Sequence, residues 1–353
     1  MSALTQTLYL GLDLKCPIVA ASSPFTGAVA SARKLEEAGV GAIVMRSAFE
    51  EEIRSEIASI YDDLGDIGSA VALDYLRADL PMRLGPQRYV ELLRAIRREV
   101  VVPVIASVNC TTSEQWTSFA KRLEVAGADA LELNVYDIPV DPEETAEEVI
   151  RRHIGIVEAV TSTVHLPVAL KISPFYSSLP NFCLRAEKAG AKGLVLFNRF
   201  LQPDIDVAAP AIREDVHLSH EDDIRLPLRW TALLRGRLKC SIALSGGVLS
   251  GEGVVKAILA GADVAYVCSA LYKGFGVVGE MMSYVDKWAT DHGHRRVDDF
   301  RGLLRETNFT DGHGFERAHY MNILAGAAAK TAPTDEEGRA SADKSDRNAW
   351  EWA

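Results

Sequence analysis

The amino-acid sequence predicts an α/β protein built as a single (β/α)8 barrel, the TIM-barrel architecture. Two short patterns interleave along the 353 residues and together mark eight strands. The predicted strands are continuous apolar runs, which is typical of parallel strands that are buried on both faces. Eight such units close most naturally into a barrel, and an open doubly wound sheet is the alternative.

The first pattern is a strand start that opens on a proline or a cysteine and continues with apolar, often β-branched residues. Proline is tolerated there because no ladder hydrogen bond is lost at the first residue of a strand. The pattern occurs four times, as CPIVAAS (16–22), VPVIASVN (102–109), LPVALKIS (166–173) and CSIALSGG (240–247).

The second pattern is a helix end followed by a strand, and it alternates with the first. Its four copies cover 36–47, 124–134, 187–198 and 258–269. Each copy has a glycine just after an amphipathic run, where a left-handed helix cap is needed. These glycines are Gly39, Gly127, Gly190 and Gly261.

Helical stretches are predicted between most of the strands, at 30–38, 88–99, 113–125, 143–159 and 251–260. The segment before the fourth of these resembles a capping box, with Asp141 as N-cap, Pro142 in the first turn and Glu144 completing the box.

Two connections, 48–87 after strand 2 and 199–227 after strand 6, are longer than the usual βα loop. We expect lids or substrate walls there, and surface decoration or oligomer contacts are the alternative. Residues 1–330 are predicted to form the barrel domain, and the polar, aperiodic residues 331–353 a disordered tail.

Composition excludes several classes of protein. The net charge of -11 disfavours nucleic-acid binding, which needs surplus Lys and Arg. The five cysteines form no C-x-x-C pair, so we expect neither a disulfide framework nor an iron–sulfur cluster. No secretory signal and no uninterrupted apolar run of membrane-spanning length is visible. The sequence therefore predicts a cytoplasmic protein without a membrane span.

Polar residues at the carboxyl ends of barrel strands indicate function, because strand interiors only fill the core. In chain order these ends are Ser22-Ser23, Arg46-Ser47, Ser107-Val108-Asn109, Asn134, Lys171, Asn198, Ser245-Gly246-Gly247 and Cys268-Ser269. No histidine lies on them, and no Asp/Glu/His cluster has metal-ligand spacing. We therefore expect no metal site and no Ser-His-Asp triad.

Two of these ends carry the cofactor prediction. Gly246-Gly247 after strand 7, with Cys268-Ser269 after strand 8, suits a phosphate site; a tight turn is the alternative for the diglycine. Lys171 ends a buried strand, where a charge is costly unless it has a partner. That partner is either an anion or electron-rich ring, or a neighbouring carboxylate. Together these groups favour flavin mononucleotide (FMN), with Lys171 stabilising negative charge on the reduced ring.

The same residues resemble the dihydroorotate dehydrogenase family over about residues 5–330. The matching segments are LGLDLKCPIVAASSPFTG (10–27), MRS (45–47), LELNV (131–135), LKISPF (170–175), LFNR (196–199), LPLRWTALL (226–234), SGGV and VCSAL. The resemblance implies an FMN-dependent oxidoreductase of the CH–CH type, a homodimer, and a hydride transferred between substrate and flavin N5. It implies cofactor contacts by Ala21, Ser22, Arg46, Ser47, Asn109, Asn134, Lys171, Asn198, Ser245, Gly246, Gly247, Cys268 and Ser269. Substrate contacts are implied for Asn134, Asn198 and Arg199.

The loop after strand 4 departs from the family pattern. Where the family has a Cys or Ser base, this chain has Asp137, preceded by Tyr136. Burial could raise the pKa of Asp137 so that it removes the substrate proton, with Tyr136 as the acid in the reverse direction. The alternative is that Asp137 is only a turn residue before the next helix.

We therefore expect a flavin-dependent oxidoreductase acting on a small dihydropyrimidine-like substrate, with an unknown electron acceptor. Two other functions remain open. One is a flavin-free barrel synthase or isomerase whose phosphorylated substrate occupies the strand 7/8 site. The other is a non-catalytic flavin-binding barrel, which the altered base loop keeps in consideration.

Overall fold

The computed structural model describes residues 5–50, 87–109, 113–213, 217–306, 317–318 and 320–325. Contacts divide the chain into two compact units, Met1–Arg305 and Glu306–Ala353. The first unit contains the barrel. In the second, residues 317–318 and 320–325 are helical. The expected domain boundary at residue 330 stays a prediction, and the expected tail of residues 331–353 lies outside the described residues.

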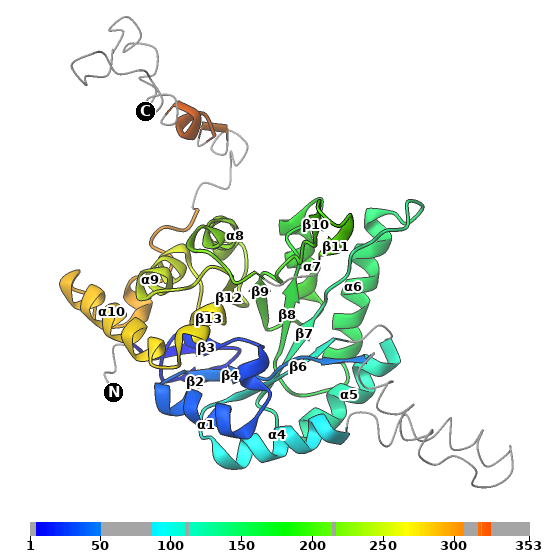
Figure 1. The fold of residues 1–353 in the computed structure, drawn as a ribbon, viewed down its shortest axis with the longest axis horizontal. Coiled ribbons are helices and arrows are strands. Elements are labelled where there is room, and N and C mark those ends of the chain that lie inside the picture. Colours follow the sequence, from blue (N-terminus) through cyan, green and yellow to red (C-terminus); the bar gives the residue numbers. More distant parts are fainter. Residues whose placement is uncertain are drawn as a thin grey trace, which may run out of the picture. The chain divides into compact units, whose positions relative to one another are not determined.

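Eight parallel strands form a closed barrel, so the predicted fold class is confirmed (Figure 1). The ring closes because β4 pairs with β3 on one side and with β6 on the other, in registers that place Val19 opposite Ala42 and Ile43 opposite Val104. The strands are β3 (Ile18–Ala20), β4 (Ala42–Val44), β6 (Val104–Asn109), β7 (Ala130–Asn134), β8 (Val168–Ile172), β9 (Gly193–Leu196), β12 (Ser241–Ser245) and β13 (Val264–Val267).

One helix follows each strand and packs on the outside of the barrel (Figure 1). Its apolar side chains and the outward side chains of the strands form the larger buried cluster. The helices are α1 (Val29–Ala38), α4 (Gln87–Glu99), α5 (Ser113–Ala126), α6 (Ala146–Thr161), α7 (Leu179–Lys188), α8 (Arg225–Arg235), α9 (Gly251–Ala260) and α10 (Val277–Asp291). All five helices predicted by range are present, with ends shifted by at most three residues.

The four predicted cap glycines all have a positive φ, from 93° at Gly127 to 116° at Gly261. The predicted start of α6 is wrong. Thr145 is its N-cap, and Thr145 and Glu148 bond to each other's backbone N–H groups as a capping box. Asp141 instead accepts the Glu143 N–H at 3.0 Å in a turn before the helix, because its side chain reaches only two residues ahead.

A short hairpin, β1 (Thr7–Tyr9) and β2 (Leu12–Leu14), fills the amino-terminal end of the barrel. Leu10 at its tip is 4 % exposed, and its backbone N–H donates to Ser241 Oγ at 3.0 Å. A Cβ on Gly193 would lie 2.5 Å from Leu10 Cδ2, so the glycine leaves room for this side chain in its present position. The sequence patterns did not predict this plug.

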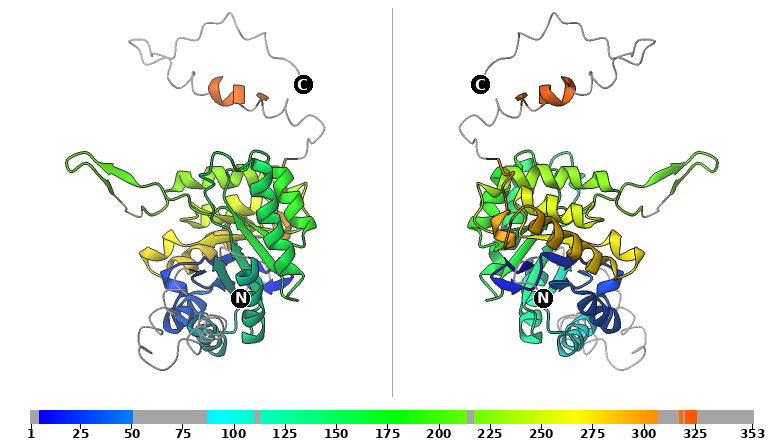
Figure 2. Two further views of the ribbon diagram at one scale, coloured as in Figure 1. Left: turned by 90° about the vertical axis from the view of Figure 1, so that its right-hand side faces the viewer. Right: turned by 90° about the vertical axis from the view of Figure 1, so that its left-hand side faces the viewer.

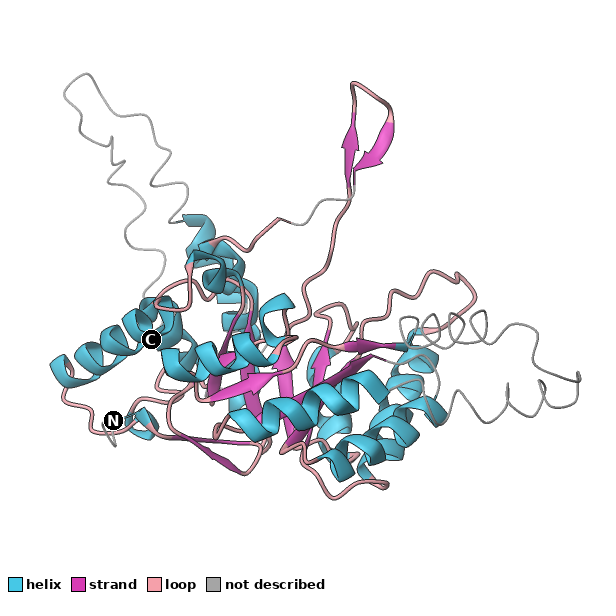
Figure 3. Ribbon diagram, turned by 60° about the horizontal axis from the view of Figure 1, so that its bottom comes forward, coloured by secondary structure: helices cyan, strands magenta, loops and turns pink. Residues whose placement is uncertain are grey.

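The two long connections differ in what the structure describes. Most of 48–87 lies outside the described residues, which include only β5 (Ala48–Phe49), Glu50 and Gln87, the first residue of α4. The second connection forms a hairpin of β10 (Asp204–Asp206) and β11 (Ala211–Arg213) that projects away from the barrel (Figures 2 and 3). Residues 217–227 then return to the barrel mouth and line the cavity described below. That part of the loop agrees with the expected wall of a binding site.

Within the part of the chain that the structure describes, no helix combines the length and apolar character needed to cross a bilayer. In the same residues no group of His, Cys, Asp and Glu side chains is placed to hold a metal ion.

Candidate active site

A cavity of about 640 Å³ lies at the carboxyl ends of the strands. Its size is ordinary for a small-molecule or cofactor site. Ten of the predicted site residues line it, although they come from five different strand ends. They are Ala21, Ser22, Lys171, Asn198, Arg199, Ser245, Gly246, Gly247, Cys268 and Ser269.

The diglycine after β12 forms one end of this cavity. Gly246 and Gly247 have φ values of 108° and 69°, which favour glycine. A Cβ on Gly247 would lie 2.2 Å from the backbone nitrogen of Ile224, so no other residue fits between the two segments. A Cβ on Gly246 would meet nothing closer than 4.0 Å, so the backbone is open on that side. A ligand phosphate could therefore approach these backbone N–H groups closely.

Ser269 begins the 3-10 helix η4 (Ser269–Lys273) beside the diglycine. Its hydroxyl accepts the backbone N–H of Ser219 at 3.1 Å, which ties the returning loop to this end of the cavity. Burial raises the pKa of the neighbouring Cys268 thiol, although Lys171 and Arg199 act to lower it. Cys268 is therefore a neutral thiol at neutral pH.

Lys171, at the end of β8, is half-buried and lines the cavity. Among the described residues its ammonium group makes no ion pair, so the alternative of a salt bridge to a neighbouring carboxylate is not observed there. The Asn198 amide nitrogen donates to the carbonyls of Val135 and Lys171, at 3.1 and 3.3 Å. These bonds fix the Asn198 side chain next to β8.

A buried hydrogen-bonded network lies beneath the cavity. Ser47 Oγ is 3.2 Å from Ser22 Oγ and 2.7 Å from Ser107 Oγ, and it accepts the Asn134 amide at 3.2 Å. The network continues from Ser107 to the fully buried Glu132 at 3.1 Å. Asn134 Oδ1 is buried and has no hydrogen-bond partner. A buried acceptor without a donor is costly, so this oxygen suits an N–H group of a ligand.

Other predicted cofactor residues lie outside the lining of this cavity. Ser47 is hydrogen-bonded to Ser22, which lines the cavity, and Asn134 is hydrogen-bonded to Ser47. Asn109 donates to the backbone carbonyl of Asn134 at 2.9 Å and so supports β7. Arg46 is exposed, and its backbone N–H donates to the Thr26 carbonyl at 3.4 Å. Its predicted cofactor contact stays a prediction.

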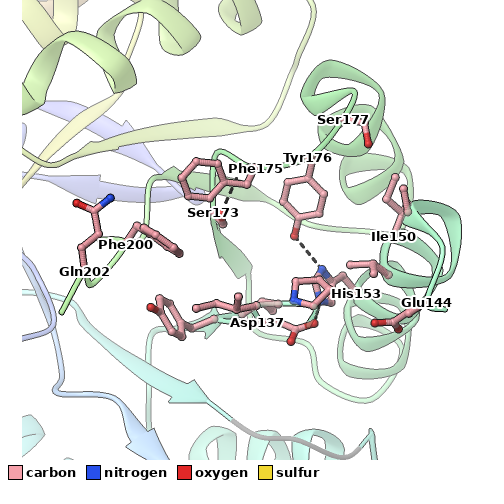
Figure 4. A pocket seen from close by; sticks show the side chains of 16 residues that line it. Asp137, Glu144, Ile150, His153, Ser173, Phe175, Tyr176, Ser177, Phe200 and Gln202 are labelled. Atoms are coloured by element: carbon pink, nitrogen blue, oxygen red, sulfur yellow. Dashed lines mark hydrogen bonds and ion pairs between the residues drawn. The ribbon is translucent and has the colours of Figure 1, made fainter. Parts of the chain in front are cut away.

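Asp137 and Tyr136 line a second cavity of about 680 Å³, which shares Phe175, Phe200 and Gln202 with the first (Figure 4). The structure therefore does not bring Asp137 into the lining that contains Lys171. Asp137 forms an ion pair with Arg152 and accepts from His153 Nε2 at 2.9 Å. The other ring nitrogen of His153 is 2.8 Å from the Tyr176 hydroxyl.

These contacts and burial decide the protonation states of Asp137, His153 and Tyr176. Burial acts to raise the pKa of Asp137, but the hydrogen bonds from Arg152 and His153 outweigh it and hold the pKa below 3.8. The net shift is therefore downward, opposite to the raised pKa considered for a catalytic Asp137, because its partners outweigh burial. Burial lowers the pKa of His153 and raises that of Tyr176. His153 is therefore neutral, and it donates to Asp137 while it accepts from Tyr176.

Sequence reasoning missed the groups that hold Asp137. His153 and Arg152 lie in α6, and Tyr176 lies in the loop after β8. The sequence prediction considered polar residues at strand ends, and none of these three residues lies at a strand end. His153 is 4 % exposed, in a helix whose buried face is otherwise apolar, and a histidine on such a face is the one signal that could have indicated it.

A protein-family model described as dihydroorotate dehydrogenase matches residues 82–287, which is more than half of the chain. The matched region contains most of the lining of both cavities, from β6 to β13.

Relatives of this chain in sequence are also named dihydroorotate dehydrogenases. The chain is 28% identical over 317 residues to dihydroorotate dehydrogenase A (fumarate) of Lactobacillus helveticus, covering 85% of this chain and 97% of the relative. It is 29% identical over 277 residues to the protein of that name from Lactobacillus delbrueckii subsp. bulgaricus, covering 74% and 86%. It is 27% identical over 308 residues to the catalytic subunit of dihydroorotate dehydrogenase B (NAD(+)) of Pyrococcus abyssi, covering 83% and 96%.

Proposed function

Because this chain belongs to the dihydroorotate dehydrogenase family, we propose that it is an FMN-dependent oxidoreductase of the CH–CH type with a small dihydropyrimidine-like substrate. One observation carries the proposal. A single cavity at the strand ends combines Lys171, which has no carboxylate partner among the described residues, with the open diglycine backbone. Asn134, whose buried Oδ1 has no hydrogen-bond partner, is linked to this lining by hydrogen bonds through Ser47 to Ser22.

The residues present fit an FMN molecule. The backbone N–H groups of Gly246 and Gly247, with Ser269, would hold the phosphate. Asn134 Oδ1 would accept a ring N–H, and the ammonium group of Lys171 would stabilise negative charge on the ring. The bound flavin would supply a two-electron acceptor for a hydride from the substrate.

In this proposal Asn134, Asn198 and Arg199 bind the substrate, and Asp137 accepts the proton that the substrate loses. Two contacts keep the Asp137 carboxylate ionised and oriented at neutral pH, namely the ion pair with Arg152 and the bond from His153. Its lowered pKa makes it a weaker base than a buried carboxylate free of partners. Tyr136, which lines the same cavity, is the proposed acid for the reverse direction.

The electron acceptor does not follow from family membership, because the relatives' names carry two acceptors, fumarate and NAD(+). The family resemblance supports a homodimer, which sedimentation equilibrium would test.

The proposed function predicts a yellow protein whose flavin absorbance survives gel filtration. Anaerobic addition of dihydroorotate, other dihydropyrimidines and NAD(P)H should then bleach the flavin bands with one member of the panel. A colourless protein that FMN does not reconstitute would contradict the proposal and favour the phosphate-binding synthase or isomerase. A yellow protein that no member bleaches would favour the non-catalytic flavin-binding barrel, for which the ion-paired Asp137 is the supporting observation.

A further inference from the structure

We propose that the second cavity, the one lined by Asp137 and Glu144, binds a cyclic or aromatic ligand through an N–H donor or ammonium group and rejects a carboxylate. The assignment of that ligand as the substrate rests on the proposed function, whereas the binding preference itself rests on the cavity alone.

The position of the cavity connects it to the flavin site. Phe175, Phe200 and Gln202 belong to the lining of both cavities. In Figure 4 these three side chains lie on one side of the cavity, and Asp137, His153 and Glu144 lie on the other. A ligand held at the acidic side could therefore place its opposite end toward the flavin site.

The acidic side has free acceptors and few free donors. Arg152 pairs with Asp137 through Oδ2 and with Glu144 through Oε1. Within the described residues Asp137 Oδ1 and Glu144 Oε2 have no hydrogen-bond partner. The ring N–H of His153 is used on Asp137, and the Tyr176 hydroxyl is used on His153. On Asp137, Glu144, His153 and Tyr176 the remaining hydrogen-bonding capacity is therefore that of lone pairs, which need a donor from the ligand.

The charge of the cavity leads to the same conclusion. Two carboxylates, Asp137 and Glu144, face a single cation, Arg152 from α6. His153 is neutral because burial lowers its pKa. No Lys or Arg is among the residues that line this cavity, whereas Lys171 and Arg199 line the flavin cavity. A ligand carboxylate would meet uncompensated negative charge here.

The opposite side suits a flat apolar group. Phe175 and Phe200 have ring centroids 4.9 Å apart at 73°, an edge-to-face pair. Their side chains are 68% and 38% exposed, so both rings offer surface to a ligand. Val149 and Ile150 from α6 also line the cavity and add apolar surface to it. Aromatic rings also favour a nearby organic cation.

Two probes of matched size and opposite charge test the proposal. We would measure binding of 2-phenylethylamine and 3-phenylpropionate to the flavin-containing protein by equilibrium dialysis at neutral pH. The amine should bind at least about tenfold more tightly than the carboxylate, as a charge-assisted hydrogen bond predicts. Glu144→Gln should remove most of this preference, and Phe175→Ala should weaken both probes.

Glu143→Gln is the matched control, because Glu143 is the adjacent carboxylate, is exposed and does not line the cavity. It should leave the preference unchanged. Equal or tighter binding of the carboxylate, no binding of either probe, or equal effects of the Glu143 and Glu144 substitutions would each overturn the proposal. Repeating the measurement on flavin-free protein separates the two hypotheses, since amine binding without flavin retention would contradict only the proposed function.

Discussion

Lys171 is a half-buried cation at a strand end, with no carboxylate partner among the described residues. We expect Lys171→Ala to slow substrate-driven flavin reduction by about 10²–10³-fold, the usual effect of removing one electrostatic stabilising group. FMN binding should weaken much less, because the phosphate end of the site is unchanged. Stopped-flow absorbance and FMN titration would measure the two effects, and equal losses in both would contradict a role in reduction.

Asp137 predicts a pH dependence of stability. Its pKa is held below 3.8 in the folded protein, so its contribution is complete above that pH and is lost as the pH falls toward the lowered pKa. Asp137→Asn should therefore cost about 1 kcal/mol at neutral pH, a value typical of a partly exposed charged pair. The difference in urea midpoint from the natural chain should shrink as the pH falls through this lowered pKa. A difference independent of pH would contradict the ion pair as its cause, and Glu143→Gln again serves as the exposed control.

At the scale of the element, two residues near the start of α6 are suited to cap a helix, but only one of them does so. Thr145 accepts the Glu148 N–H, whereas Asp141 stabilises only the turn before the helix. Thr145→Ala should cost about 1 kcal/mol of unfolding free energy, and Asp141→Ala only a few tenths. Urea denaturation of both variants measures this, and a larger loss for Asp141→Ala would restore the start predicted from sequence.

The amino-terminal hairpin is a second element whose energetics can be tested. Leu10 is 4 % exposed inside the barrel end, whereas Leu8 in the same hairpin is 54 % exposed. Leu10→Ala should cost about 2–4 kcal/mol, because it leaves a cavity in the closed end. Leu8→Ala should change the unfolding free energy by less than about 0.5 kcal/mol. Similar losses for the two variants would show that the hairpin does not plug the barrel.

For the whole molecule, the proposed FMN site predicts stabilisation by mass action. FMN at a hundredfold excess over its Kd should add about 2.7 kcal/mol to the flavin-free protein. That corresponds to a Tm higher by roughly 4 °C for a domain of about 300 residues. Riboflavin, which lacks the phosphate, should raise the Tm less, because it cannot use Gly246, Gly247 and Ser269. Equal shifts for the two flavins in a thermal melt would argue against the phosphate site.

The barrel could be predicted from the sequence because its signals are local. A helix end that needs a positive φ favours a glycine, such as Gly39 or Gly261. A proline such as Pro103 is tolerated only at certain positions of a strand. The start of α6 was predicted wrongly because Asp141 and Thr145 are both good caps, and the choice depends on whether Glu148 can return the bond.

The cavity that contains Lys171 was also largely predictable, since parallel strands in a barrel all end on one face. That rule is sufficient to place Ser22, Lys171, Asn198 and Gly246 together, although they are far apart in the chain. It does not say which of these side chains find partners. The unpaired Asn134 Oδ1 appears only when the whole hydrogen-bonded network is present.

The sequence by itself thus determined the barrel, the gathering of the polar strand ends on one face of it, and the family, because each depends on local patterns or on residue order. Only the tertiary structure decided the state of Asp137 and the place of the first hairpin. Asp137 is ionised because Arg152 and His153 reach it from a helix, and Leu10 is buried because Gly193 leaves room for it. Contacts of this kind join residues whose spacing follows no repeat, so no periodicity in the sequence marks them.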